Sequence, residues 1–140
     1  MLDNVDVVWG YEEGEWLYYL PAAPEFSTLT DMEDGLGYWI KMTADDTLPI
    51  YGSELPDPPI LPPVYSVDEG WNLIGFKSTT TMTIGTYLTT ISDDNTASMV
   101  IYGWDALPQN YELVCVGETS VDTNLVPGSG YWLYLIEDGY

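Results

Sequence analysis

One motif occurs twice in this chain at a fixed spacing, and this duplication limits the available folds more than any other feature. Asp34-Gly-Leu-Gly-Tyr-Trp-Ile-Lys-Met42 is followed 93 positions later by Pro127-Gly-Ser-Gly-Tyr-Trp-Leu-Tyr-Leu135. Upstream, Val7-Val-Trp-Gly-Tyr11 aligns with Val100-Ile-Tyr-Gly-Trp104 at the same spacing. Similarity at a constant spacing indicates duplicated structural units. We therefore expect two related copies that contain equivalent strands.

In each copy, segments rich in aromatic and β-branched residues predict three strands joined by polar turns. The predicted strands are 5–11, 15–20 and 37–43 in the first copy, and 98–104, 110–116 and 130–136 in the second. The middle strands align when the turn of the second copy is two residues longer.

A further strand and a short helix are predicted only before the second copy. The strand covers 69–76, and apolar residues at helical spacing predict one short helix near 83–92. Because no such segment precedes the first copy, we expect that copy to be incomplete.

These patterns predict an all-β, antiparallel, sandwich- or barrel-like fold with two pseudo-repeats and one short helix. We divide the chain into a partial first repeat (1–47), a Pro-rich connector (48–64) and a complete second repeat (65–140), forming one compact unit. The prolines of the connector favour an extended conformation and oppose pairing as a central strand.

The charge of the chain is strongly one-sided. Asp and Glu total 23 and Lys and Arg total two, without His, so the net charge is −21. Such a surface repels phosphate backbones, which argues against nucleic-acid partners. No apolar run is long enough for a membrane span, so direct membrane insertion is not expected. A solvated acidic surface is the ordinary interpretation, and a saline or calcium-rich setting is the alternative.

The residue types present argue against an enzyme. Without His, neither a Ser-His nor a Cys-His pair can form. The single cysteine, Cys115, shares strand register with Tyr111 and Leu113 and is expected to be a buried, unreactive thiol. Only a carboxylate-pair glycosidase remains chemically feasible, and no pair of acids stands out.

Aromatic side chains are the candidate ligand-binding groups. The chain contains 6 Trp and 12 Tyr. Their flat faces suit the C–H faces of sugar rings, although aromatic residues also serve as core and interface groups. The densest cluster, which we take as the candidate binding set, comprises Trp9, Tyr11, Trp16, Tyr18 and Tyr19.

The repeated Gly-x-Gly-Tyr-Trp motif is interpreted as architecture. Its glycines permit positive φ or close backbone approach, and the Tyr and Trp that follow project to opposite faces of a strand. A phosphate-binding loop is excluded because the third glycine and the strand-to-helix context are missing. The structural set comprises Gly35, Gly37, Tyr38, Trp39, Gly128, Gly130, Tyr131 and Trp132, together with Trp71.

A cation site is the remaining candidate. Asp93, Asp94 and Asn95 offer several oxygen ligands of the type that Ca²⁺ prefers. They lack the spacing of the Asp-x-Asp-x-Asp-Gly loop, so a solvated acidic turn is the alternative. No other cofactor is expected.

Gly70-Trp-Asn-Leu-Ile-Gly-Phe76, followed downstream by Gly128-Ser-Gly-Tyr-Trp132, resembles a repeat module of large secreted and cell-surface proteins of bacteria and archaea. The resemblance covers 64–136 as a full unit and 5–43 as a partial one. It implies an extracellular or surface-attached, non-catalytic structural or adhesive module whose partners are neighbouring modules, other surface proteins or glycans. The alternatives are a carbohydrate-binding module and, after it, the glycosidase.

The charge imbalance leads to a first prediction. Adding NaCl or CaCl₂ should raise the melting temperature, because few carboxylates can pair with a cationic side chain and salt screens their repulsion. Differential scanning calorimetry over a salt series measures this. A melting temperature that is unchanged or falls would contradict the expectation that repulsion between carboxylates limits stability.

Overall fold

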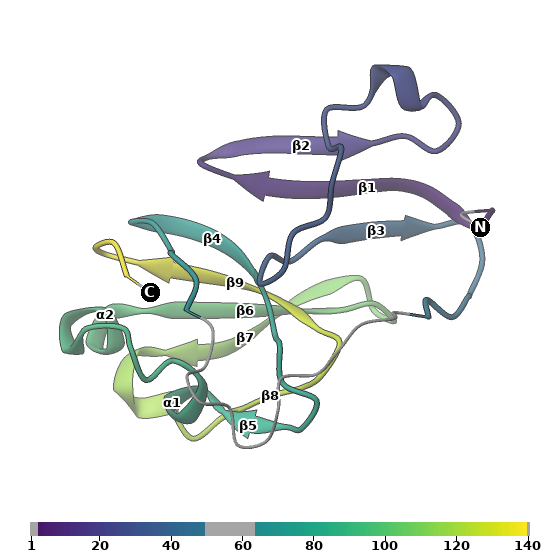
Figure 1. Ribbon diagram of the computed structural model, residues 1–140. Coiled ribbons are helices and arrows are strands. Elements are labelled where there is room, and N and C mark those ends of the chain that lie inside the picture. The colour runs from purple at the N-terminus through teal and green to yellow at the C-terminus, as the bar shows by residue number, and fades with distance from the viewer. Residues whose placement is uncertain (1–2, 50–63, 140) are drawn as a thin grey trace.

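The two copies form two antiparallel sheets in the computed structural model, which describes residues 3–49 and 64–139 (Figure 1). The first sheet has the order β2-β1-β3, and the second has the order β4-β9-β6-β7. Within the described residues the sheets are sandwich-like and no barrel closes, so the predicted strand-dominated class is confirmed. Most of the predicted connector lies outside the described residues.

The element bounds are as follows. The first sheet consists of β1 (Val5–Glu12), β2 (Glu15–Tyr19) and β3 (Trp39–Met42); the second consists of β4 (Gly70–Gly75), β6 (Val100–Asp105), β7 (Asn110–Val116) and β9 (Gly130–Leu135). Strands β5 (Met82–Thr83) and β8 (Asn124–Leu125) pair separately, and the helices are α1 (Ile84–Tyr87), α2 (Asp93–Ser98) and 3-10 turns at Pro24–Phe26 and Gly117–Ser120.

Strand pairing follows the sequence duplication. Three consecutive pairs between β1 and β3 recur 93 positions later between β6 and β9; the first set is Val7 with Lys41, Val8 with Ile40 and Trp9 with Trp39. In the neighbouring ladder, Tyr11 with Trp16 recurs as Trp104 with Tyr111. Trp16 and Tyr111 are 95 positions apart, whereas Tyr11 and Trp104 are 93 apart. This difference confirms that the turn of the second copy is two residues longer.

The predicted short helix near 83–92 is present as α1, although it ends at Tyr87, and a second helix, α2, follows from Asp93. The Thr83 hydroxyl accepts a hydrogen bond from the Thr86 N–H at the start of α1, and the Ser92 hydroxyl accepts one from the Asn95 N–H at the start of α2. Such caps begin new helices, and Asp93 and Asp94 in the first turn of α2 complement its dipole. The apolar spacing continues to Ile91, beyond the end of α1, and therefore does not show where that helix ends. Among the described residues, no helix is long and apolar enough to cross a membrane.

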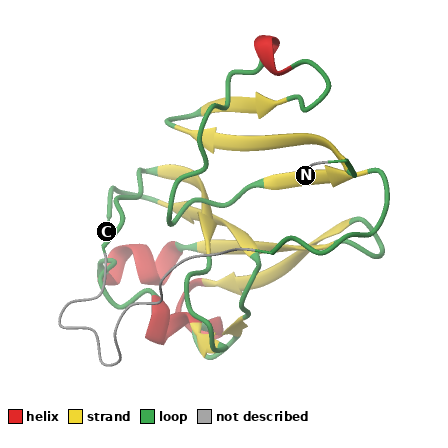
Figure 2. Ribbon diagram, turned by 45° about the vertical axis from the view of Figure 1, so that its right-hand side comes forward, coloured by secondary structure: helices red, strands yellow, loops and turns green. Residues whose placement is uncertain are grey.

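The main core lies on one face of the second sheet, beneath the helices and the β5-β8 pair (Figure 2). On β9, Leu133 and Leu135 are fully buried on this face, whereas Trp132 and Tyr134 point the other way. Burying a leucine side chain contributes about 1.5–3 kcal/mol. Cys115 is buried here as expected, and burial raises the pKa of its thiol. The helices therefore cover one face and leave the opposite face for aromatic residues.

The two copies contact each other through reciprocal aromatic contacts. Trp39 of the first copy packs edge-on against Trp104 and Tyr111 of the second, with ring centroids 4.6 and 5.7 Å apart. The equivalent Trp132 packs against Tyr11 and Trp16 at 5.1 and 5.6 Å. Each contact is thus repeated with the copies exchanged, as in a two-fold symmetric interface.

The Gly-x-Gly-Tyr-Trp motif forms the same turn in both copies. Gly35 and Gly128 have φ of +88° and +79°, a conformation that favours glycine. The Tyr38 hydroxyl accepts a hydrogen bond from the Glu33 N–H at 2.6 Å, and the Tyr131 hydroxyl accepts one from the Val126 N–H at 3.0 Å. The motif is therefore a structural turn that each tyrosine closes.

The first copy is joined to β4 through the glycines of this turn. The Gly37 N–H donates to the Leu73 carbonyl and the Gly75 N–H donates to the Gly35 carbonyl, both at 2.9 Å. A Cβ atom on Gly37 would lie 2.7 Å from the Ile74 carbonyl oxygen. The close approach of the two backbones explains the requirement for glycine.

This geometry predicts unequal effects of one substitution in the two copies. Gly37→Ala should lower the free energy of unfolding by about 1–3 kcal/mol, because the added methyl group overlaps backbone atoms. Gly130→Ala is the matched control, since its Cβ would meet no atom nearer than 3.5 Å. Urea denaturation of both variants measures the difference. Equal losses in the free energy of unfolding would contradict a close backbone contact between Gly37 and β4.

Candidate aromatic groove

A groove of about 530 Å³ opens on the aromatic side of the second sheet, where it meets the first. Strands of both copies contribute to it, and the lining side chains are all aromatic: Tyr11, Trp16, Trp71, Tyr102, Tyr111 and Trp132. Pockets for small ligands commonly have volumes of about 300–1,000 Å³ and aromatic walls. Its size and lining therefore suit a small ligand or a segment of a longer one.

The reciprocal contact builds one wall of the groove. Tyr11 and Trp16 form a cross-strand pair on β1 and β2, with ring centroids 5.2 Å apart. The Trp132 ring packs against both. Alternation along each strand places these three side chains on one side of their sheets. This wall forms only when the two copies are in contact.

The second sheet supplies the rest of the lining. Trp71 on β4 lies 6.3 Å from Trp132, with the ring planes at 89°, and 6.1 Å from Tyr102 on β6. Tyr111 on β7 lies 6.3 Å from Tyr102. The rings contact one another as a continuous series across four strands, so each ring restrains its neighbour.

Three of the lining residues expose large fractions of their surface. The exposed fractions are 51% for Trp16, 43% for Trp71 and 56% for Tyr111. Exposed apolar patches on soluble proteins commonly mark interaction sites. These three rings are the surfaces that a ligand would contact first.

The electrostatic surroundings select against anions. Glu12 and Glu15 form the next cross-strand pair beyond Tyr11 and Trp16, and Glu112 directly follows Tyr111. Alternation directs their side chains to the other face of each strand, so they act on the groove at a distance, as part of a net charge of −21. A negatively charged ligand would be repelled, whereas a neutral ligand would contact uncharged rings.

Two of the predicted ligand-binding residues, Tyr11 and Trp16, lie in the groove. Trp9 and Tyr18 pair farther along the same strands and do not line it, and Tyr19 pairs with Val8. Four lining residues were outside the predicted binding set: Trp71, Tyr102, Tyr111 and Trp132. Trp71 and Trp132 were assigned to the structural motif instead. The duplication offered a signal, because Tyr111 aligns with Trp16.

The candidate calcium ligands lie at the start of α2. Asn95 is fully buried, and its side-chain oxygen accepts hydrogen bonds from the N–H groups of Ile136 and Glu137. Its amide nitrogen donates to the Glu137 carbonyl. Asn95 therefore attaches α2 to the end of β9. Within the described residues no three His, Cys, Asp or Glu residues are grouped as metal ligands, and the Ca²⁺ hypothesis stays a prediction.

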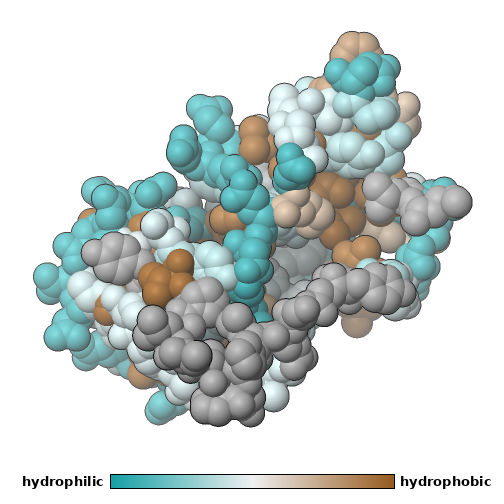
Figure 3. Space-filling view, viewed as in Figure 1, coloured by the Kyte–Doolittle hydropathy of each residue, from teal (hydrophilic) through white to brown (hydrophobic). Residues whose placement is uncertain are grey.

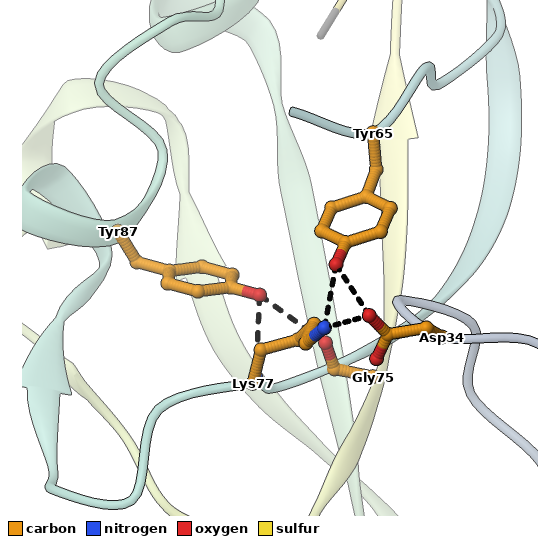
Figure 4. A network of polar contacts seen from close by, with 5 residues as sticks. All are labelled: Asp34, Tyr65, Gly75, Lys77 and Tyr87. Carbon is orange, nitrogen blue, oxygen red and sulfur yellow. Dashed lines mark hydrogen bonds and ion pairs between the residues drawn. The ribbon is translucent and has the colours of Figure 1, made fainter. Parts of the chain in front are cut away.

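A polar network that the sequence did not predict joins the two copies near β4 (Figure 4). The Lys77 ammonium donates to Asp34 and, at 2.5 Å, to the Tyr65 hydroxyl, which in turn donates to Asp34 at 2.7 Å. The Tyr87 hydroxyl donates to the Gly75 carbonyl and accepts from the Lys77 N–H. The loop that begins the Gly-x-Gly motif is thus held against the end of β4.

This network shifts two pKa values. The hydrogen bonds from Lys77 and then Tyr65 lower the pKa of Asp34. Desolvation opposes charge on Lys77, but its hydrogen bonds to Asp34 and Tyr65 outweigh that effect and raise its pKa. Both shifts favour the ionised pair.

Comparisons with protein families, with curated proteins and with solved structures found no match to this chain.

The Asp34–Lys77 pair predicts a pH-dependent contribution to stability. At pH 7, Lys77→Met should lower the free energy of unfolding by about 0.5–1 kcal/mol. Because Asp34 has a lowered pKa in the folded state, the loss should shrink as the pH falls below about 3.9, the value of an ordinary aspartate. It should also shrink above about pH 10.4, as folded Lys77 loses its proton.

Lys41→Met is the matched control for this measurement. It gives the same net charge and removes a pair whose lysine is more exposed, in which Lys41 contacts Asp6 at 2.5 Å. Thermal denaturation across pH compares the two variants. Equal losses with the same pH profile would show that only net charge matters.

Proposed function

We propose that this chain is a non-catalytic adhesive module of a larger extracellular or cell-surface protein, and that its aromatic groove binds a neutral glycan. The observation that carries the proposal is a groove lined entirely by aromatic side chains, three of them substantially exposed. Sugar rings present apolar C–H faces that pack on aromatic rings, and Tyr and Trp add polar tips for hydroxyl groups.

The chemistry of the groove favours binding over hydrolysis. Glycosidases use two carboxyl groups about 5–10 Å apart on either side of the scissile bond. The groove lining contains aromatic residues and no carboxylate within the described parts of the chain. A glycan held on these rings would therefore be bound without an adjacent acid and base.

A purely structural repeat is the second candidate. The contacts of Trp39 and Trp132 support it, because they use aromatic rings to join the copies. In that case the exposed rings would be the remainder of an internal interface. The two candidates differ in one respect, since only the first requires saturable binding of a soluble sugar.

A glycan array followed by titration calorimetry tests the proposal. Trp16→Ala and Trp71→Ala should each weaken binding of the selected neutral glycan about tenfold or more, because aromatic contacts at the centre of a site contribute about 1–2 kcal/mol or more. Phe26→Ala is the matched control, since Phe26 is 67% exposed and lies outside the groove.

Near-UV circular dichroism and thermal denaturation show whether each variant keeps its fold. Failure of the unmodified chain to bind any neutral glycan would reject the proposal in favour of the structural repeat. Retained affinity in both folded tryptophan variants would place the glycan elsewhere on the surface.

A further inference from the structure

Among the described residues, strand β9 has a neighbour on each side, whereas its counterpart β3 has only one. β9 pairs with β6 on one edge and, over six residue pairs from Gly70–Leu135 to Gly75–Gly130, with β4 on the other. β3 pairs with β1 and forms the edge of its sheet. Within residues 3–49 and 64–139, the backbone hydrogen bonds between the first copy and β4 end at Gly37, before β3 begins.

Burial differs in the same way. On β9, Leu133 and Leu135 are 0% exposed. Their equivalents on β3, Ile40 and Met42, are 38% and 40% exposed, although Ile40 pairs with β1 in the same register as Leu133 with β6. Figure 3 shows apolar surface in the region of β1 and β3, beside strongly hydrophilic areas. The helices and the β5-β8 pair cover Leu133 and Leu135, whereas the described residues place no such layer over Ile40 and Met42. β3 therefore combines an apolar open face with an edge that lacks a partner among the described residues.

An exposed apolar edge strand readily pairs with another strand. We infer that the free edge of β3 is a docking site for a β-strand of a neighbouring module, with the Gly-Trp-Asn-Leu-Ile-Gly pattern of β4. Addition of a strand to a sheet edge is a common mode of protein recognition, in which main-chain hydrogen bonds give affinity and side chains give specificity. This site is separate from the glycan groove and does not depend on it.

The register of β4 on β9 specifies how the incoming strand would lie. Transferred to β3, that register places its leucine opposite Trp39, its asparagine opposite Ile40 and its tryptophan opposite Lys41. In the second copy the corresponding Trp71 packs against Tyr134, with ring centroids 5.2 Å apart. At β3 the partner is Lys41, whose ammonium group pairs with Asp6 at 2.5 Å and can at the same time attract a tryptophan face. The edge therefore fits this type of strand chemically as well as by position.

A synthetic peptide with the sequence of residues 67–78 tests the inference. Fluorescence anisotropy of the labelled peptide, titrated with the full chain in NaCl to screen charge repulsion, should show saturable binding. Hydrogen exchange of the chain should slow at residues 39–42 when the peptide is present, because a new ladder protects the edge amides.

Matched variants locate the contact. The double variant Ile40→Lys with Met42→Lys should weaken peptide binding at least tenfold, since it places charge on the docking edge. Leu107→Lys is the control, because Leu107 is 96% exposed in the turn between β6 and β7. A peptide carrying Asn72→Pro and Ile74→Pro should not bind, because proline cannot donate to the ladder.

Three results would overturn the inference. The first is the absence of both peptide binding and exchange protection, and the second is binding that the double variant leaves unchanged, which would indicate replacement of the chain's own β4. The third is self-association in sedimentation velocity that the double variant abolishes, which would make a second copy the occupant. The sugar titrations report on the groove alone, so failure of either proposal is distinguishable from failure of the other.

Discussion

The reciprocal packing of Trp39 and Trp132 on the aromatic pairs of the opposite copy is the interaction on which this structure depends. It determines which faces of the two sheets meet, and each edge-to-face pair adds about 0.5–1.5 kcal/mol beyond the area it buries. The helices can then cover only the opposite face of the second sheet. The same contact creates the groove, because Trp132 brings the rings of the first copy beside those of the second.

With only two lysines available, ion pairs cannot provide a general means of holding the chain together. Both lysines nevertheless join segments that are distant in sequence: Lys41 pairs with Asp6, and Lys77 pairs with Asp34. The second pair is the more sheltered at its lysine end and lies beside the backbone contact between the copies. Both lysines are engaged in these pairs, so uncharged contacts between aromatic rings and between main-chain groups carry the rest of the contact between the copies.

Much of the fold could be predicted from the sequence, because duplicated motifs and alternating aromatic residues report directly on strand positions. The pairing register followed from the same alignment, including the longer turn before Tyr111. The end of α1 at Tyr87 could not be predicted, since Ile84, Leu88 and Ile91 keep helical spacing beyond it. Only two of the six groove residues belong to the predicted binding set. Tyr11 and Trp16 are neighbours in a hairpin, whereas Trp71 and Tyr102 join them only through pairing between distant strands.

The symmetry of the contact between the copies has a consequence for how that contact forms. In an isologous interface, each partner offers the same patch that it receives, and this is the normal interface of a homodimer. Here both patches belong to one polypeptide, so the contact forms within the chain and its strength does not depend on protein concentration. The two halves also need not be identical, as they are in a homodimer, which allows the helical layer to cover the second copy alone among the described residues.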